Sequence, residues 1–109
     1  MPDNLEFLYL LKPAKRAASL EEYMKALTPE EKEVLQQHFK YMDELQKARK
    51  VILGGPCLDA AYIILILRVE SKEEAEKIIA NEPAVKANIL AVESQHPFQT
   101  EVIAMEFHN

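Results

Sequence analysis

The sequence predicts an α+β fold with the element order strand, helix, strand, strand, helix, strand. Three observations predict it: apolar runs at the start, middle and end of the chain, a long amphipathic segment with helix-start chemistry, and a second capped helical segment after the central run. At 109 residues the chain has the length of one domain, so we expect residues 1–109 to form a single unit.

The first strand is expected over Leu5 to Leu11, a short run rich in aromatic and branched residues that stops before Pro13. A short helix is expected from Ser19 to Ala26, because Ser19 and Glu22 have the spacing of a capping box.

The main helix has the clearest start signal. Thr28 can cap it, Pro29 suits the first helical position, and Glu31 lies three residues after the cap. Acidic residues lead and basic residues finish, which complements the helix dipole, and the pattern extends to about Lys50. At 100° per residue the apolar positions form one stripe, which predicts one buried face: Val34, Leu35, Tyr41, Met42, Leu45 and Ala48.

Two strands should follow. Val51 to Leu53 has strand character, which Gly54-Gly55-Pro56 is expected to break. The run from Ala60 to Glu70 is almost continuously apolar, as expected of a central strand covered on both faces.

The last third repeats the alternation. Ser71 and Glu74 have capping-box spacing and open a helix to about Ala80, and Pro83 can start one more helical turn through Lys86. The tail has strand patterns at 89–93 and again at 100–107, where Ile103, Met105 and Phe107 alternate with the other residues, and His96 is expected in the loop between them.

This order is the split β-α-β pattern of ferredoxin-like folds, an antiparallel sheet with both helices on one face. Strand residues that are apolar on both sides require a cover for the other face. In so small a chain a second copy is the economical cover, so we expect a homodimer or a higher oligomer.

Composition excludes several classes. The formal net charge is −5, and only Lys12, Lys15 and Arg16 cluster, so nucleic acid is not an expected partner. The longest apolar run is too short to cross a bilayer, and the first residues lack a signal-peptide pattern. Cys57 is the single cysteine. We therefore expect a cytoplasmic protein.

His38 is the most informative position for function, because it falls near the middle of the buried stripe of the main helix. A buried imidazole must find a hydrogen-bond partner. One interpretation is a core histidine bonded to a backbone carbonyl. The other is a general acid or base that lines a pocket, since histidine titrates closest to neutrality.

The other candidate site residues have a role only if certain residues lie next to them, and the spacing along the sequence does not show which residues do. Glu82 stands before Pro83 and either favours a helix start or orients His38. Gly55 and Pro56 either form a turn or place backbone against a ligand, and the following Asp59 is a turn carboxylate or a second partner for His38. Tyr41 shares the face of His38, as core or as pocket wall. The scattered histidines predict no metal site.

The ordered combination of these segments resembles the YciI-like, or YCII-related, family. The run LTPEEKEVLQQHFKYMDELQKARKVILGGPCL (27–58) is similar to the signature of a helical histidine followed by a strand and Gly-Pro. LILRVESKEEA (65–75) and EPAVKA (82–87) are similar to the second half, and Leu10, Leu11 and Pro13 to the first strand.

The resemblance implies a ferredoxin-like α+β fold that forms a dimeric barrel, with a histidine–aspartate pair in a cleft. His38 matches the histidine. The usual Asp-Pro is Glu82-Pro83 here, which keeps the charge and adds one methylene, and the usual glycine is Asn88, which tolerates a left-handed backbone. The segment 14–27 is longer than in the smallest members and could cover the mouth of the pocket.

Three functions follow as expectations. The first is a cofactor-independent, metal-free enzyme of lyase or isomerase type, in which His38 moves a proton of an unknown small molecule and Glu82 or Asp59 sets its tautomer. The second is a noncatalytic dimeric module that binds a metabolite. The third is a relative of the dimeric-barrel monooxygenases, either cofactor-free or with haem.

Overall fold

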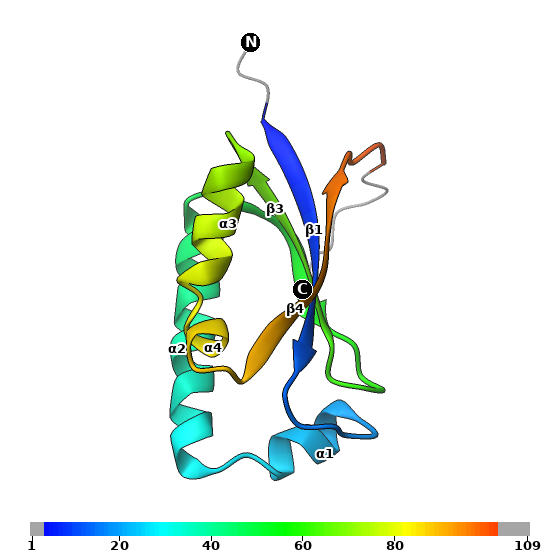
Figure 1. Cartoon of the computed structure of the whole chain (residues 1–109), viewed down its shortest axis with the longest axis vertical. Helices are drawn as coiled ribbons and strands as arrows, with labels where there is room; N and C mark the ends of the chain where they lie inside the picture. The colour runs from blue at the N-terminus through cyan, green and yellow to red at the C-terminus, as the bar shows by residue number, and fades with distance from the viewer. Residues whose placement is uncertain (1–3, 103–109) are drawn as a thin grey trace, which may run out of the picture.

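Four strands form one antiparallel sheet in the computed structural model, which describes residues 4–102 (Figure 1). The strands are β1 (Leu5–Pro13), β2 (Val51–Pro56), β3 (Ile63–Val69) and β4 (Leu90–Phe98). Their order across the sheet is β2-β3-β1-β4, so the first and third strands occupy the centre and β2 and β4 form the edges.

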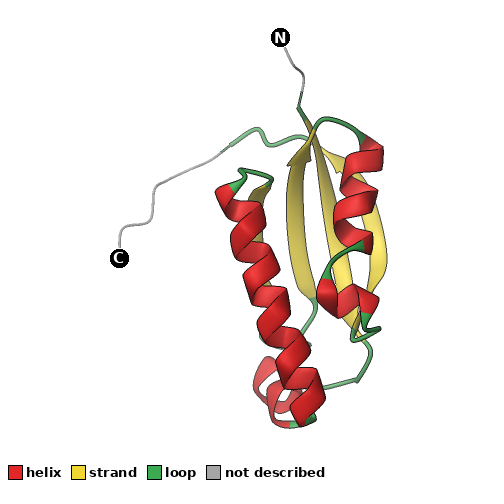
Figure 2. Cartoon of the chain, turned by 90° about the vertical axis from the view of Figure 1, so that its left-hand side faces the viewer, coloured by secondary structure: helices red, strands yellow, loops and turns green. Residues whose placement is uncertain are grey.

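Four helices connect the strands: α1 (Leu20–Lys25), α2 (Pro29–Lys47), α3 (Lys72–Ala80) and α4 (Pro83–Lys86). The long helix α2 and the pair α3 and α4 lie side by side in front of the same sheet face (Figure 2). This is the β-α-β-β-α-β arrangement of a ferredoxin-like fold, as the sequence predicted, with α1 and α4 added before α2 and β4.

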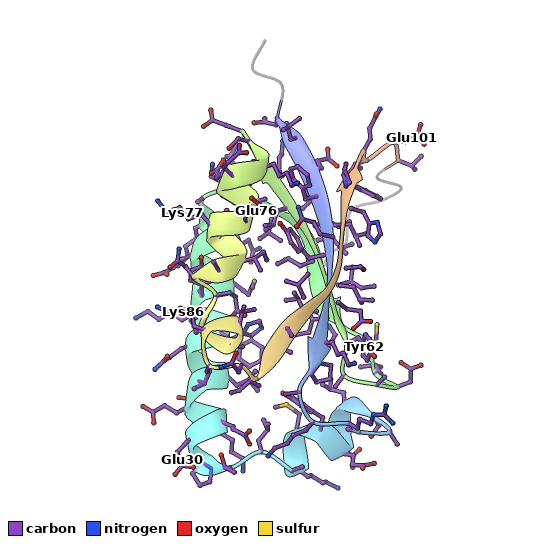
Figure 3. The ribbon with its side chains drawn as sticks, in the orientation of Figure 1. Glu30, Tyr62, Glu76, Lys77, Lys86 and Glu101 are labelled. Atoms are coloured by element: carbon purple, nitrogen blue, oxygen red, sulfur yellow. The ribbon has the colours of Figure 1, made fainter. Side chains whose placement is uncertain are left out.

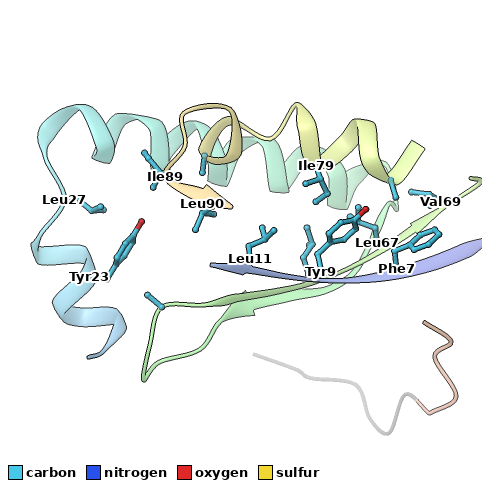
Figure 4. Packing of buried hydrophobic residues seen from close by; sticks show 14 residues of the cluster. Phe7, Tyr9, Leu11, Tyr23, Leu27, Leu67, Val69, Ile79, Ile89 and Leu90 are labelled. Carbon is cyan, nitrogen blue, oxygen red and sulfur yellow. The ribbon is translucent and has the colours of Figure 1, made fainter. Parts of the chain in front are cut away.

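The core lies between the sheet and the helices (Figure 4). On β1, Phe7, Tyr9 and Leu11 face the helices, and their alternation with half-buried Leu8 and Leu10 is the period of two expected of a strand. The main core residues that complete this layer are Leu65, Leu67, Val69, Ala75, Ile79, Ala84, Ile89 and Leu90.

The opposite face of the sheet has no helix over it in the described part of the chain (Figure 1). Pairing of β1 with β3 places Leu8 opposite Ile66 and Leu10 opposite Ile64. These residues alternate with the core residues, so they form an apolar patch on the uncovered face.

Each of the predicted helix starts is present. Thr28 and Glu31 form a complete capping box, in which each side chain accepts a hydrogen bond from the other residue's backbone N–H. Ser19 and Ser71 cap α1 and α3 with one half of this pattern: each hydroxyl accepts from the backbone N–H three residues later, without the return bond of a full capping box.

Helix α2 ends at Lys47, three residues before the predicted end. Arg49 adopts a left-handed backbone with φ 61°, and the N–H groups of Arg49 and Lys50 donate to the carbonyls of Gln46 and Leu45. This is a Schellman motif without its usual glycine. Helix α4 ends the same way, with Asn88 at φ 60° as the left-handed residue, which confirms the backbone role expected of Asn88.

Several strand boundaries differ from the prediction. Gly54-Gly55-Pro56 does not break β2 but forms its second half, because β2 is an edge strand and tolerates Gly and Pro. The central strand starts at Ile63 rather than Ala60, after a turn in which Ala61 has φ 60°. The tail forms one strand through Phe98, and His96, predicted in a loop, pairs within it opposite Leu8.

A strand was predicted over 100–107, but residues 100–102 have no regular secondary structure. Residues 103–107 lie outside the described range. Glu6 instead accepts hydrogen bonds from the backbone N–H and hydroxyl of Thr100. The charged side chains of Glu30, Lys77 and Lys86 lie on the outer surface (Figure 3). Within residues 4–102, no helix has the length and apolar character needed to cross a bilayer.

Candidate functional site

His38 and Glu82 form a buried pair between α2 and the start of α4. The Nδ1 atom of His38 lies 2.7 Å from Oε1 of Glu82, although the residues are 44 positions apart in sequence. His38 is 5% exposed and Glu82 is completely buried. The partner of the central histidine is therefore a carboxylate, and not the backbone carbonyl of the alternative interpretation.

The carboxylate of Glu82 is held by backbone as well as by the histidine. Glu82 is the N-cap of α4: Oε1 accepts from the N–H of Ala84 at 3.1 Å, and Oε2 accepts from the N–H of Val85 at 3.2 Å. A buried carboxylate is costly unless it is paired and hydrogen-bonded, and here three N–H groups face its two oxygens. The helix-start role and the histidine-partner role of Glu82 thus coexist in one side chain.

This arrangement fixes the tautomer of His38. A carboxylate accepts hydrogen bonds, so Nδ1 carries a hydrogen and donates it to Glu82. In the neutral ring Nε2 is then unprotonated and has a free lone pair. Because Nδ1 is occupied, Nε2 is the atom that His38 offers to a bound molecule.

His38 also lines a cavity of about 500 Å³ between α2 and the edge strand β2. The volume suits a small organic molecule. Helix α2 contributes residues spaced three and four apart, so that one face of the helix forms one wall: Leu35, His38, Phe39, Met42 and Gln46. The other walls come from α1, β2, β3 and the start of β4: Leu20, Tyr23, Met24, Val51, Ile52, Leu53, Gly54, Gly55, Pro56, Ala61, Ile63, Leu65 and Leu90.

Gly55 and Pro56 line this cavity, where the sequence placed them. Gly54, which was not among the site residues, lines it as well. A Cβ at Gly54 would lie 3.2 Å from Cδ1 of Leu65, whereas a Cβ at Gly55 would meet nothing within 4 Å. Because β2 is an edge strand, some of its backbone groups face away from β3 and are free to bond a ligand.

Tyr41 is half-buried and is not among the residues that line the cavity. Its hydroxyl donates to the carbonyl of Ile78 at 2.8 Å, so it ties α2 to α3. Burial, and then the carboxylates of Glu82 and Glu44, raise the pKa of Tyr41.

Asp59 lies on the exposed turn between β2 and β3, and among the described residues it makes no hydrogen bond with His38. Of the two carboxylates that sequence reasoning offered to His38, the structure brings only Glu82 into contact. Across residues 4–102, no three His, Cys, Asp or Glu side chains come together as a metal-binding group.

Sequence reasoning missed most of the cavity wall. Met24, Phe39, Gln46 and Leu53 were not proposed for the site, and Met42 was expected only to pack on the buried face of α2. Phe39 is 58% exposed and meets the His38 ring edge-on, with centroids 5.3 Å apart. Helical spacing from His38 could have identified Leu35, Met42 and Gln46, which are three, four and eight residues away.

Comparisons with known proteins agree with this fold. The family model described as the YCII-related domain matches residues 7–99. No curated protein matches the chain. Among solved structures, the chain is similar to 5-chloro-2-hydroxyhydroquinone dehydrochlorinase from Burkholderia phenoliruptrix in complex with 2,5-dihydroxybenzoquinone. The TM-score is 0.54, the identity is 22%, and the match covers 86% of this chain and 93% of that one.

Proposed function

The chain belongs to the YCII-related domain family, and from this premise we propose that it is a small-molecule enzyme in which His38 acts as a general base and acid. The observation that carries the proposal is the buried His38–Glu82 pair, whose histidine lines a cavity of about 500 Å³. A general base must present a free lone pair to its substrate, and in this proposal Nε2 of His38 supplies it.

Each part of the pair has a chemical role in this proposal. Nε2 takes a proton from a bound molecule, and the imidazolium that forms is stabilised by the adjacent carboxylate of Glu82. Glu82 is a positioning residue, because it acts on the substrate only through His38. The same imidazolium can return the proton to another atom, which gives an isomerisation, or can accompany loss of a leaving group, which gives an elimination.

The similar solved protein supports the type of reaction. Its name says that it is a dehydrochlorinase, and loss of HCl from an organic molecule requires removal of a proton together with departure of chloride. We therefore propose lyase or isomerase chemistry on a small organic compound, with neither a metal nor an organic cofactor taking part.

We also propose that two copies pack through the uncovered sheet face. Leu8, Leu10 and Ile64 are half-buried on this face, beside the buried Ile66, and a two-fold dimer covers them with an identical patch. A second copy is favoured over another protein because an apolar patch is self-complementary in chemistry.

The test of the function compares the wild type with His38→Gln, which keeps a polar side chain and removes the base. Both proteins are assayed for chloride release from 5-chloro-2-hydroxyhydroquinone, and for solvent deuterium exchange into a panel of enolisable ketones. We expect wild-type turnover of at least one compound and a loss of about 10²–10⁴-fold in the variant. Equal rates would remove His38 from the chemistry. Binding of these compounds without turnover would favour the metabolite-binding module.

A further inference from the structure

The side chains that line the cavity include no acidic side chain and no lysine or arginine. Among the residues that line it, all within the described range 4–102, none is Asp, Glu, Lys or Arg. The polar side chains are those of His38, Gln46 and Tyr23, and the remaining side chains are apolar. A carboxylate or phosphate that entered this cavity would meet no Lys or Arg side chain on its wall.

The lysines at the C-terminal end of α2 are already paired outside the cavity. Nζ of Lys47 lies 2.9 Å from Asp43, and Nζ of Lys50 lies 2.7 Å from Glu74. In helix α1, which also contributes to the cavity wall, Nζ of Lys25 lies 2.9 Å from Oε1 of Glu21. Recruiting any of these lysines to an anionic ligand would break an existing ion pair.

Glu82 makes the electrostatic preference stronger. With His38 neutral, the pair carries one negative charge, held by Glu82 directly behind the imidazole. An anion that arrives from solvent adds a second negative charge in a place where water is largely excluded and repulsion is strong. Tyr41, whose pKa responds to the charge of Glu82, and Tyr23, which lines the cavity, have pKa values raised first by burial, and neither adds positive charge.

A neutral ligand with an acidic hydroxyl avoids this repulsion. Its O–H bond breaks as the Nε2–H bond forms, and the electron pair stays on the ligand oxygen. The imidazolium then lies between two anions, Glu82 on Nδ1 and the ligand oxygen on Nε2. The charge that the ligand acquires is therefore balanced by the proton that it gave away.

We propose that the cavity selects uncharged, largely apolar molecules with a weakly acidic hydroxyl, such as phenols or enols, and discriminates against carboxylates and phosphate esters. This inference names the substrate class of the site and rests on the proposed function. Phe39, Met24 and Met42 offer aromatic and thioether surfaces against which a flat ring packs well.

Three benzenes, each with two identical groups at opposite ends of the ring, test the selectivity. Whichever end of the molecule enters the cavity, the same group faces His38. The full-length protein is titrated at pH 7 with hydroquinone, with 1,4-dimethoxybenzene and with terephthalate, and binding is followed by NMR of the His38 ring and the cavity methyl groups. Hydroquinone should bind at least tenfold more tightly than either of the others. The proposal is wrong if terephthalate binds as tightly as hydroquinone. It is also wrong if hydroquinone leaves the NMR signals of His38 unchanged.

A gain-of-function variant tests the electrostatic cause. Gln46 is exposed at the rim of the cavity, so Gln46→Lys adds a cation there without disturbing the core. It should raise the affinity for terephthalate relative to hydroquinone severalfold, whereas the matched Gln46→Met should not. An unchanged ratio in Gln46→Lys would contradict the inference. A failure of the proposed function is distinguished from this result by the turnover assay, in which the wild type and His38→Gln would then have equal rates.

Discussion

Oε1 of Glu82 accepts hydrogen bonds from two directions, from Nδ1 of His38 at 2.7 Å and from the backbone N–H of Ala84 at 3.1 Å. The side chain that begins α4 is thus also the group that orients a histidine on α2. The two roles share one oxygen, so the position of α4 and the tautomer of His38 are coupled.

Replacing Glu82 with Gln removes the charge of the side chain but keeps its shape, so it separates the two contributions to turnover. The variant keeps the volume and one acceptor oxygen but cannot stabilise an imidazolium electrostatically, so we expect turnover to fall by about 10²–10⁴-fold. Glu82→Asp keeps the charge and shortens the side chain by one methylene, and its activity should be intermediate. Steady-state kinetics measure the rates, and ¹⁵N NMR of the imidazole reports the tautomer. Wild-type rates and an unchanged tautomer in Glu82→Gln would show that the carboxylate has no positioning role.

Asp59 provides the matched control. Because it lies on an exposed turn, Asp59→Asn should leave both turnover and the NMR signals of His38 as they are in the wild type. The free energy of unfolding should change by less than about 0.5 kcal/mol, as is usual at exposed positions. A loss of activity comparable to that of Glu82→Gln would mean that Asp59 reaches the site in the working protein.

Tyr9 is buried with a hydroxyl that has no hydrogen-bond partner among the described residues, between the sheet and α3 (Figure 4). Tyr9→Phe should therefore raise the free energy of unfolding near neutral pH, by about 1 kcal/mol, since an unpartnered buried hydroxyl is destabilising. Urea denaturation measures it. A clear loss of stability would indicate a bound water or another partner at this hydroxyl.

The same residue predicts a pH dependence. Burial, followed by the charge of Glu76, raises the pKa of Tyr9 to about 12 from the ordinary value of 10. Between these values the unfolded chain loses this proton and the folded protein keeps it, so stability is lost as the pH rises from 10 toward 12. Tyr9→Phe should lose less stability over that range than the wild type. Some alkaline loss should remain, because burial also raises the pKa values of Tyr23 and Tyr41.

Leu10 tests the proposed dimer. Leu10→Lys places a charge in the apolar patch of the uncovered face, and sedimentation should show a monomer where the wild type is a dimer. Gln37→Lys adds the same charge on the exposed surface of α2 and should leave the dimer intact. Circular dichroism confirms that both variants are folded. A dimer that persists in Leu10→Lys would place the interface elsewhere.

Arg49 has an unfavourable backbone conformation that glycine would relieve. Left-handed geometry costs a non-glycine residue roughly 1–2 kcal/mol, and the added freedom of the unfolded chain offsets part of this gain. Arg49→Gly should therefore stabilise the protein by about 0.5–1 kcal/mol, as measured by urea denaturation. Lys50→Gly, one residue later, should not be stabilising. A destabilised Arg49→Gly would show that the arginine side chain makes a compensating interaction.

Much of the fold was predictable from local chemistry. Thr28, Ser19 and Ser71 marked the helix starts because capping is a contact between residues three apart, and the alternation in β1 identified its buried face. The strand boundaries were predicted wrongly where pairing with a neighbouring strand decides the conformation. Gly54-Gly55-Pro56 continues a strand because β2 is at an edge, and the tail remains extended through Pro97 because β4 pairs with β1 along its length.

The sequence by itself determined the order of elements, the burial of His38 on the apolar stripe of α2, and the presence of an acid before a helix-starting proline. Only the tertiary structure decided that Glu82, and not Asp59, meets His38, and that α2 and β2 enclose a cavity without charged side chains. The reason is physical: caps and periodicity act within a few residues along the chain. A contact across 44 residues, by contrast, depends on how whole helices pack against the sheet.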